Sequence, residues 1–248
     1  MKCRVELGGR AAARRQWLRH CSALALSAVG AGPALAQATA PAAAPKSAPI
    51  PTPTAAKAPA ILVVGDSLSA EYGIARGSGW VALLERRLAA EKLAWRVVNA
   101  SISGDTTSGG RSRLPALLQR EKPAVVVIEL GGNDALRGLP LNATRDNLLA
   151  MTQAAKAAGA RVLIAGMQMP PNYGRQYGQQ FAQLFAEVAK AEGTALVPFF
   201  LAGVADVPGA ESNFQPDRIH PVAAAQPRML DNVWPALRPL LTRAGSAR

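Results

Sequence analysis

The stretch Ile61-Leu62-Val63-Val64-Gly65-Asp66-Ser67-Leu68-Ser69 decides the fold. Its four apolar residues, rich in β-branched side chains, predict a buried strand, and the Gly-Asp-Ser after them predicts a turn. In an open parallel sheet, ligands bind at the carboxyl edge of the strands, and a helix starting at Ser67 would aim free backbone N–H groups there. Ser67 is therefore a candidate nucleophile. The alternative is that Ser67 only caps the next helix, as serine commonly does.

The first 36 residues have the pattern of a signal peptide. A basic stretch that includes Arg14-Arg15 is followed by a short apolar run, and Ala34-Leu35-Ala36 supplies small residues for cleavage. The apolar run is shorter than the roughly 20 residues that span a bilayer, so we expect no stable membrane span after cleavage. The arginine pair, followed by Trp and Leu, resembles a twin-arginine signal, and the ordinary secretory route is the alternative. Either route predicts a periplasmic or secreted bacterial protein.

One globular domain is expected after the leader. Residues 37–59 are mainly Ala, Pro, Ser, Thr and Lys, which predicts a disordered linker, and the domain is expected over residues 60–243 with a tail over 244–248. The net charge of +12 belongs mostly to the leader and linker, which leaves 20 basic and 15 acidic residues over 60–248. The remaining charges are scattered without aromatic interleaving, which argues against a nucleic-acid partner. Both cysteines lie in the leader, so the domain has no disulfide and no cysteine-containing metal site.

Strand and helix patterns alternate through the domain. Strands are predicted at Ile61–Val64, Trp95–Asn99, Ala124–Leu130, Arg161–Gly166 and Ala195–Val197, and helices at Gly79–Lys92, Gly110–Glu121, Asn142–Ala158, Gln179–Glu192 and Val222–Leu240. Such alternation predicts an α/β fold with a parallel sheet covered by helices on both faces. The run Val125-Val126-Val127-Ile128 is apolar without a break, which favours a central place in the sheet.

A histidine and an aspartate that could activate Ser67 follow the fifth predicted strand. Serine needs a neighbouring base, and His220 is the only histidine outside the leader. Asp217 precedes it by three residues, a spacing that brings both side chains to one face of a helical turn. The carboxylate would then hold Nδ1–H and leave Nε2 facing Ser67. The alternative for this pair is a helix cap beside a chance histidine.

Donors for a developing oxyanion are present in the first three loops. They are the backbone N–H of Ser67, the backbone N–H of Gly104 and the side-chain amide of Asn133. The Ser-Gly-Asp and Gly-Gly-Asn-Asp stretches around Gly104 and Asn133 are also ordinary turn formers. Each motif alone is weak, but all of them follow strands of one sheet and would therefore meet at one edge.

These motifs resemble the four blocks of the SGNH, or GDSL, hydrolase family. The blocks are Gly65-Asp66-Ser67-Leu68, Gly104, Gly131-Gly132-Asn133-Asp134 and Asp217-x-x-His220, and the likeness runs from Ile61 through Gln226-Pro227. The resemblance implies a flavodoxin-like three-layer α/β/α sandwich with a five-stranded parallel sheet. It also implies hydrolysis of acyl esters and thioesters without a cofactor or metal. By motif, Ser67 would be the nucleophile, Gly104 and Asn133 oxyanion donors, and Asp217 and His220 the rest of the triad.

A closer likeness is to a branch of that family with thioesterase, lysophospholipase and arylesterase activities. It rests on Val98–Thr106, Glu129–Asp134 with Leu136-Arg137-Gly138, and Pro171–Gly174. Glu71 departs from the glycine that is frequent there, so its carboxylate would alter substrate preference or simply point to solvent.

The acyl group would be held at the same edge of the sheet. Residues Leu136–Leu141 and Met167–Tyr177 are loops long enough to wall a groove, and methionine suits irregular apolar ligands. Met167 and Met169 are equally suited to the core. The residues expected to contact the substrate are Asp66, Leu68, Leu136, Met169 and Tyr173.

Other patterns in the sequence point to functions that compete with the esterase. Gly77-Ser78-Gly79-Trp80-Val81-Ala82 matches a dinucleotide-binding pattern, but it lies about a dozen residues after the strand. The G-x-S-x-G elbow of α/β-hydrolases is not formed, because Ser69 stands where the second glycine belongs. A carbohydrate or peptidoglycan O-acetyl esterase, or a non-catalytic exported binding protein on the same fold, remain as alternatives. The sequence predicts no oligomeric state.

Overall fold

A single five-stranded parallel sheet organises the part of the chain that the structure describes. The structure, a computed structural model, describes residues 58–242, so the predicted leader, most of the linker and the tail lie outside the described residues. The strands are β1 (Ala60–Gly65), β2 (Arg96–Asn99), β3 (Val125–Glu129), β4 (Arg161–Ala165) and β5 (Ala195–Val197). Their order in the sheet is β2-β1-β3-β4-β5, and every pair is parallel. The predicted α/β fold with a five-stranded parallel sheet is confirmed.

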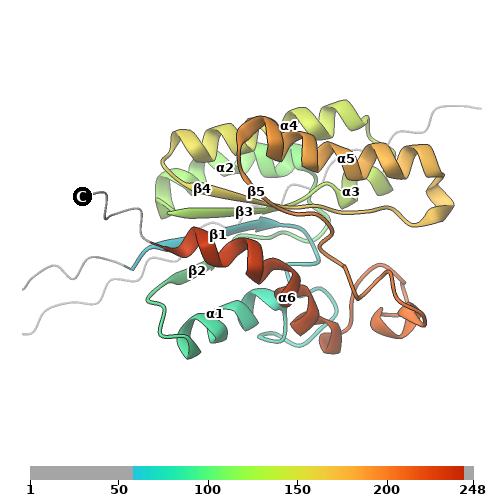
Figure 1. Cartoon of the computed structure of the whole chain (residues 1–248), viewed down its shortest axis with the longest axis horizontal. Coiled ribbons are helices and arrows are strands. Elements are labelled where there is room, and N and C mark those ends of the chain that lie inside the picture. Colours follow the sequence, from blue (N-terminus) through green and yellow to red (C-terminus); the bar gives the residue numbers. More distant parts are fainter. Residues whose placement is uncertain (1–57, 243–248) are drawn as a thin grey trace, which may run out of the picture. The chain divides into compact units, whose positions relative to one another are not determined.

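Helices cover both faces of this sheet, which gives the three predicted layers. The helices are α1 (Trp80–Ala90), α2 (Thr107–Glu121), α3 (Gly132–Leu136), α4 (Leu141–Ala157), α5 (Arg175–Glu192) and α6 (Gln226–Leu237). Figure 1 shows α2, α4 and α5 on one face and α1 and α6 on the other. Short 3-10 turns lie at Pro171–Tyr173, Ala210–Asn213, Ala223–Ala225 and Arg238–Leu241.

The central strands are apolar on both faces because helices cover both. Every residue of β1 and β3 is buried, and Val63 of β1 pairs with Asn99 of β2 on one side and with Val127 of β3 on the other. A strand that contacts two helix layers has no solvent-facing side, so alternation of apolar and polar residues is lost. The interior place predicted for Val125–Ile128 is confirmed.

Helices α2 and α5 begin several residues earlier than predicted from the sequence. In each, a glycine close to the predicted start lies inside the helix. Helix α2 starts at Thr107 because Thr106 caps it, its side chain accepting from Gly109 N, and the helix passes through Gly110. A Cβ on Gly110 would lie 2.2 Å from Leu130 Cδ1, so this glycine serves close packing and does not end the helix. Helix α5 likewise starts at Arg175 with Gly178 inside its first turns.

The remaining differences concern short segments. The Gly131–Asp134 stretch, expected as a loop, contains the start of the five-residue helix α3. The last helix is shorter than Val222–Leu240 at both ends, because a 3-10 turn over Ala223–Ala225 precedes α6 and another over Arg238–Leu241 follows it. Ser67 also lies outside any helix, in a series of turns that separates β1 from α1.

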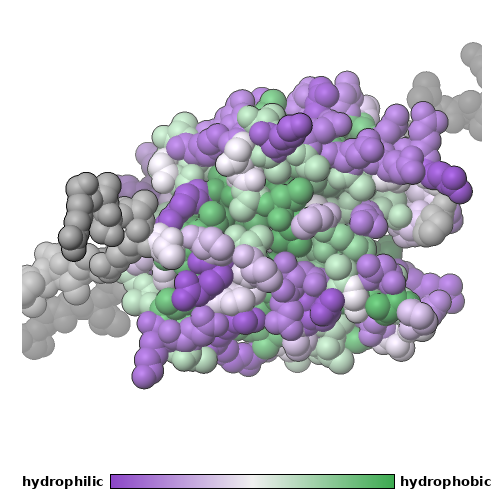
Figure 2. Space-filling view, viewed as in Figure 1, coloured by the Kyte–Doolittle hydropathy of each residue, from purple (hydrophilic) through white to green (hydrophobic). Residues whose placement is uncertain are grey.

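The short strand β5 forms one edge of the sheet. Figure 2 shows the side of the molecule that faces the viewer in Figure 1. Apolar surface lies in the middle of that side, between the more hydrophilic surfaces of the helices above and below it. Within residues 58–242, no helix has the length and apolar character needed to cross a membrane.

Candidate active site

Ser67 lies in the tight turn that leaves β1. The carbonyl of Asp66 accepts from Ser69 N at 3.3 Å and from Ala70 N at 3.0 Å, and its side-chain Oδ1 accepts from Leu68 N at 3.0 Å. These bonds bend the chain directly after the buried strand, so Ser67 stands at the carboxyl edge of the sheet.

His220 lies against Ser67 although 153 residues separate them in sequence. His220 Nε2 is 2.8 Å from Ser67 Oγ, and His220 Nδ1 is 2.6 Å from Asp217 Oδ2. A neutral imidazole satisfies both contacts only if Nδ1–H donates to Asp217 and Nε2 accepts from the Ser67 hydroxyl. The structure thus brings together the hydroxyl, imidazole and carboxylate singled out in the sequence.

The turn that carries Asp217 and His220 is not helical, which corrects the expected geometry. Arg218 has a left-handed φ of 58°, and Asp217 Oδ1 accepts from Ile219 N at 2.9 Å and from His220 N at 3.0 Å. One carboxylate therefore shapes the turn with one oxygen and holds the imidazole with the other. Burial raises the pKa of Asp217, but these N–H bonds and the bond from His220 outweigh it and lower the pKa to about 2.

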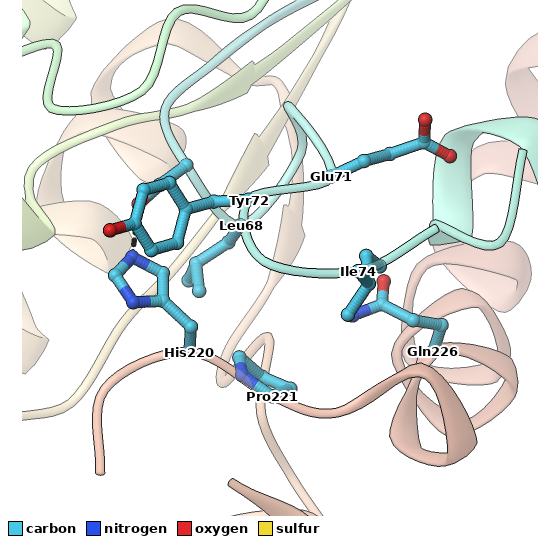
Figure 3. A pocket seen from close by; sticks show the side chains of 8 residues that line it. Leu68, Glu71, Tyr72, Ile74, His220, Pro221 and Gln226 are labelled. Carbon is cyan, nitrogen blue, oxygen red and sulfur yellow. Dashed lines mark hydrogen bonds between the residues drawn. The ribbon is translucent and has the colours of Figure 1, made fainter. Parts of the chain in front are cut away.

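A tyrosine that the sequence did not single out packs on the histidine. The rings of Tyr72 and His220 have centroids 4.3 Å apart and are tilted by 37°. Figure 3 shows the two rings side by side at a small hollow. The hollow is lined by Ser67, Leu68, Glu71, Tyr72, Ile74, His220, Pro221 and Gln226. The only signal in the sequence for this contact is that a tyrosine closely follows the serine.

Glu71 neither approaches the nucleophile nor points to solvent. Its carboxylate accepts from the backbone N–H of Gly77 at 2.9 Å and of Gly79 at 2.8 Å, and Figure 3 shows it directed away from His220. Glu71 itself has a left-handed φ of 60°. Its carboxylate holds the segment between the Ser67 turn and α1, so the interpretation that it simply points to solvent was wrong, while an effect on substrate preference stays a prediction.

The loop after β3 meets the loops after β1 and β2 through Asn133. Its Nδ2 donates to Asp66 Oδ2 and to the carbonyl of Asp105, each at 3.0 Å. The carbonyl of Gly104, whose φ is 79°, accepts from Arg137 at 2.7 Å. Among the described residues, the backbone N–H groups of Ser67 and Gly104 donate to no protein acceptor. The three predicted oxyanion donors thus belong to loops that touch one another.

Two buried carboxyl groups lie behind the Ser67 turn. Glu129 Oε2, at the end of β3, accepts from Ser69 Oγ at 2.7 Å and from Asp66 N at 3.3 Å, and Ser69 Oγ accepts from Trp80 Nε1 at 3.0 Å. Desolvation raises the pKa of Asp66 to about 6 and that of Glu129 well above its ordinary range, with the charge of Asp66 adding to the rise at Glu129. Asp66 is only 3% exposed, so it stands behind the site and not on the surface where a substrate contact was predicted.

The other residues predicted to contact a substrate are spread around the edge. Leu68 lines the hollow, while Leu136 at the end of α3 and Tyr173 in the 3-10 turn before α5 are exposed. Met169 is half-buried and packs against the core, and Met167 is buried in it. Within residues 58–242, no cluster of three or more His, Cys, Asp or Glu side chains is arranged to hold a metal ion.

The fold and this edge of the sheet define a class of protein. A doubly wound sheet whose carboxyl edge carries a hydrogen-bonded serine, histidine and aspartate has the parts of a hydrolase that uses serine as its nucleophile. The family model described as "GDSL-like Lipase/Acylhydrolase family" matches residues 63–226. The chain belongs to this family of hydrolases.

Known relatives cover almost the whole described region. "Esterase TesA" of Pseudomonas aeruginosa is 59% identical over 186 residues, which are 75% of this chain and 91% of that protein. "Thioesterase 1/protease 1/lysophospholipase L1" of Escherichia coli is 42% identical over 187 residues, covering 75% of this chain and 87% of the relative. The solved structure of the psychrotrophic esterase EstA from Pseudoalteromonas sp., inhibited by monoethylphosphonate, has a TM-score of 0.69 and 38% identity. The matched region is 74% of this chain and 99% of the chain in that structure.

Proposed function

We propose that the protein is an exported serine esterase and thioesterase that works through an acyl-enzyme. The observation that carries this proposal is the chain of contacts from Ser67 Oγ to His220 Nε2 and from His220 Nδ1 to Asp217. The names of the similar proteins, which include esterase and thioesterase, support the same class of substrate. The leader pattern of residues 1–36 supports export.

In the first step Ser67 Oγ attacks the acyl carbon while His220 Nε2 takes its proton. Asp217 stabilises the imidazolium that forms, and His220 then gives the proton to the departing alcohol or thiol. In the second step water attacks the acyl-enzyme, with His220 again accepting a proton and returning it to Ser67 Oγ. The carboxylic acid leaves and the free enzyme is restored.

The oxygen that becomes negative needs donors at the same place. The backbone N–H groups of Ser67 and Gly104 are free to supply two of them. Asn133 would supply the third, and because both of its amide hydrogens already have acceptors, the substrate oxygen would share or replace the bond to Asp66. Asp66 therefore acts on the reaction through Asn133 as a positioning residue.

Covalent labelling with a fluorophosphonate probe tests the nucleophile. We expect the unmodified protein to be labelled and Ser67→Ala to lose the label, because phosphonylation needs an activated serine. Ser212→Ala, at an exposed serine whose hydroxyl donates to Gly209, is the matched control and should label normally. An unlabelled native protein would favour the alternative of a binding protein on the same fold.

Substrate preference requires a separate measurement. A series of nitrophenyl esters and acyl-CoAs of increasing chain length would compare esters with thioesters on one scale of kcat/KM. A preference for medium or long chains would agree with the exposed Leu136 and Tyr173. Activity on acetyl esters alone would instead support the O-acetyl esterase alternative.

A further inference from the structure

Large apolar side chains are exposed almost only where the strands end. One or more come from each connection that follows a strand: Tyr72 after β1, Ile102 after β2, Leu136 and Leu139 after β3, Tyr173 after β4 and Ile219 after β5. We call these six residues the apolar rim. The one further large apolar side chain exposed among residues 58–242, Val207, lies in the connection after β5 as well. Scattered apolar exposure is ordinary, but its restriction to one edge of a sheet marks a surface that binds something.

The apolar rim surrounds the serine. Tyr72 packs on His220, and Ile219 directly precedes it. The backbone N of Ile102 donates to the carbonyl of Gly65 at 3.0 Å, next to the Ser67 turn. Of the six rim residues only Tyr72 lines the hollow beside His220, so the others face outward around the site and do not form the wall of that hollow.

The charges beside the apolar rim are mainly positive. Arg76, Arg137, Arg175 and Arg218 are exposed and form no ion pair within the described residues. The carboxylates nearest the site are already engaged: Asp217 with His220, Asp105 with Arg113, and Glu71 with backbone N–H groups. Asp66 and Asp134 are buried, and the exposed acidic side chains that remain in these connections, Asp206 and Glu211, lie in the same loop as Val207.

We propose that the apolar rim docks the protein on an anionic phospholipid surface, with Ser67 facing the lipid. Apolar side chains that enter the interface and arginines that meet lipid phosphates are the two contributions that hold a protein on such a membrane. A second copy of the chain fits less well, because two apolar rims that both carry positive charge would repel each other. The proposal rests on the proposed function in one respect: a lipid surface is where long-chain acyl esters accumulate.

Co-sedimentation with phosphatidylglycerol and phosphatidylcholine vesicles tests the docking. All variants carry the same N-terminus, so residues 1–57 contribute equally and only differences between variants are compared. We expect Ile102→Ser to weaken binding to phosphatidylglycerol about tenfold and Arg175→Gln about fivefold. Ile102→Leu and Lys122→Gln are the matched controls and should bind within about twofold of the native protein. Lys122 caps the C-terminal end of α2, opposite to the end that follows Ile102.

Activity measurements separate this proposal from the catalytic one. Ile102→Ser and Arg175→Gln should keep native rates on a short soluble nitrophenyl ester and lose rate on an acyl ester embedded in phosphatidylglycerol vesicles. Ser67→Ala should bind vesicles as the native protein does, so a failure of hydrolysis leaves the docking result intact. Equal binding by rim variants and controls, or no preference for phosphatidylglycerol, would overturn the proposal. So would a lipid-free dimer that Ile102→Ser dissociates, which would assign the rim to contact between copies.

Discussion

Asp217 performs two tasks with its two carboxylate oxygens. Oδ1 accepts two backbone N–H groups and shapes the turn, while Oδ2 holds the ring of His220. Because both tasks favour the ionised form, the pKa of about 2 keeps Asp217 charged at any pH at which the protein would work. The base that we propose for Ser67 is thus oriented by a permanent negative charge.

Substitutions of Asp217 separate orientation from folding. We expect Ser67→Ala to lower kcat by about 10^5 to 10^6, and Asp217→Ala by about 10^2 to 10^4, because the reacting atom remains in the second variant. Asp217→Asn should keep an oxygen for the turn but place an amide against His220 Nδ1, which disfavours the required tautomer. Steady-state rates on a nitrophenyl ester, with circular dichroism to check folding, measure both effects. Native activity in Asp217→Asn would contradict the role of the carboxylate.

Asp66 gives the protein a specific dependence of stability on pH. Because burial raises its pKa in the folded protein from 3.8 to about 6, the folded state holds more protons than the unfolded state between these values. The free energy of unfolding should therefore fall as pH rises through this window, by roughly 2 to 3 kcal/mol at most. Urea unfolding at several pH values from 4 to 7 measures this slope.

Asp66→Asn is the comparison for that slope. The variant cannot titrate at this position, so its slope between pH 4 and 6 should be shallower than that of the native protein, whatever its absolute stability. Glu129 is present in both proteins, and burial also raises the pKa of its carboxyl, so it adds a slope of the same sign to both curves and the difference between the curves reports Asp66. Parallel curves for the two proteins would show that Asp66 titrates elsewhere.

At the scale of elements, the junction of β1 with the turn after it leaves no room for a side chain at Gly65. A Cβ on Gly65 would lie 2.7 Å from Glu129 Oε2 and 2.8 Å from Ser69 Oγ. The bonds among Glu129, Ser69 and Trp80 therefore need a residue without a side chain at the end of the strand. Packing from β3 and α1 thus sets the position of the turn that carries Ser67.

Substitution by alanine should have opposite effects at Gly65 and at Gly178, because only Gly65 lacks room for a Cβ. Gly65→Ala must displace Glu129 or the turn, so we expect a loss of roughly 1 to 3 kcal/mol in unfolding free energy and lower activity. Gly178→Ala, inside α5, places its Cβ no closer than 4.0 Å to Met169 O and should raise stability by up to about 1 kcal/mol. Chemical denaturation of both variants checks this, and a neutral Gly65→Ala would show that the junction relaxes freely.

The elements also show where sequence patterns succeed and where they fail. The strands were predicted well because burial on both faces produces continuous short apolar runs, such as Val125–Ile128, and these are easily recognised in a sequence. The starts of α2 and α5 were missed because Gly110 and Gly178 look like helix breakers in a sequence. At Gly110 the close approach of Leu130 is visible only in three dimensions.

At the scale of the whole molecule, the site residues could be paired from sequence because the choices were few. The domain has one histidine, and an aspartate three residues before it, so His220 and Asp217 were the natural partners for Ser67. The supporting contacts could not be predicted, because Tyr72 on His220 and Glu129 under Ser69 depend on how distant segments pack.

The proposed export makes a prediction at the scale of the whole chain. If the leader is a twin-arginine signal, Arg14→Lys and Arg15→Lys together should stop export, because that route reads the arginine pair. Cell fractionation followed by an immunoblot would measure it, with Arg10→Lys as the matched control. Unchanged export of the double variant would leave the ordinary secretory route.

Ser67 and His220 are 153 positions apart in the sequence, which bears on when the proposed site is assembled. The serine is synthesised just after the first strand, whereas the imidazole follows the fifth. By the proposed mechanism, a chain in which these two segments have not yet met has a hydroxyl without a base and would not hydrolyse esters. The onset of turnover during refolding would then report when the two ends of the domain come together.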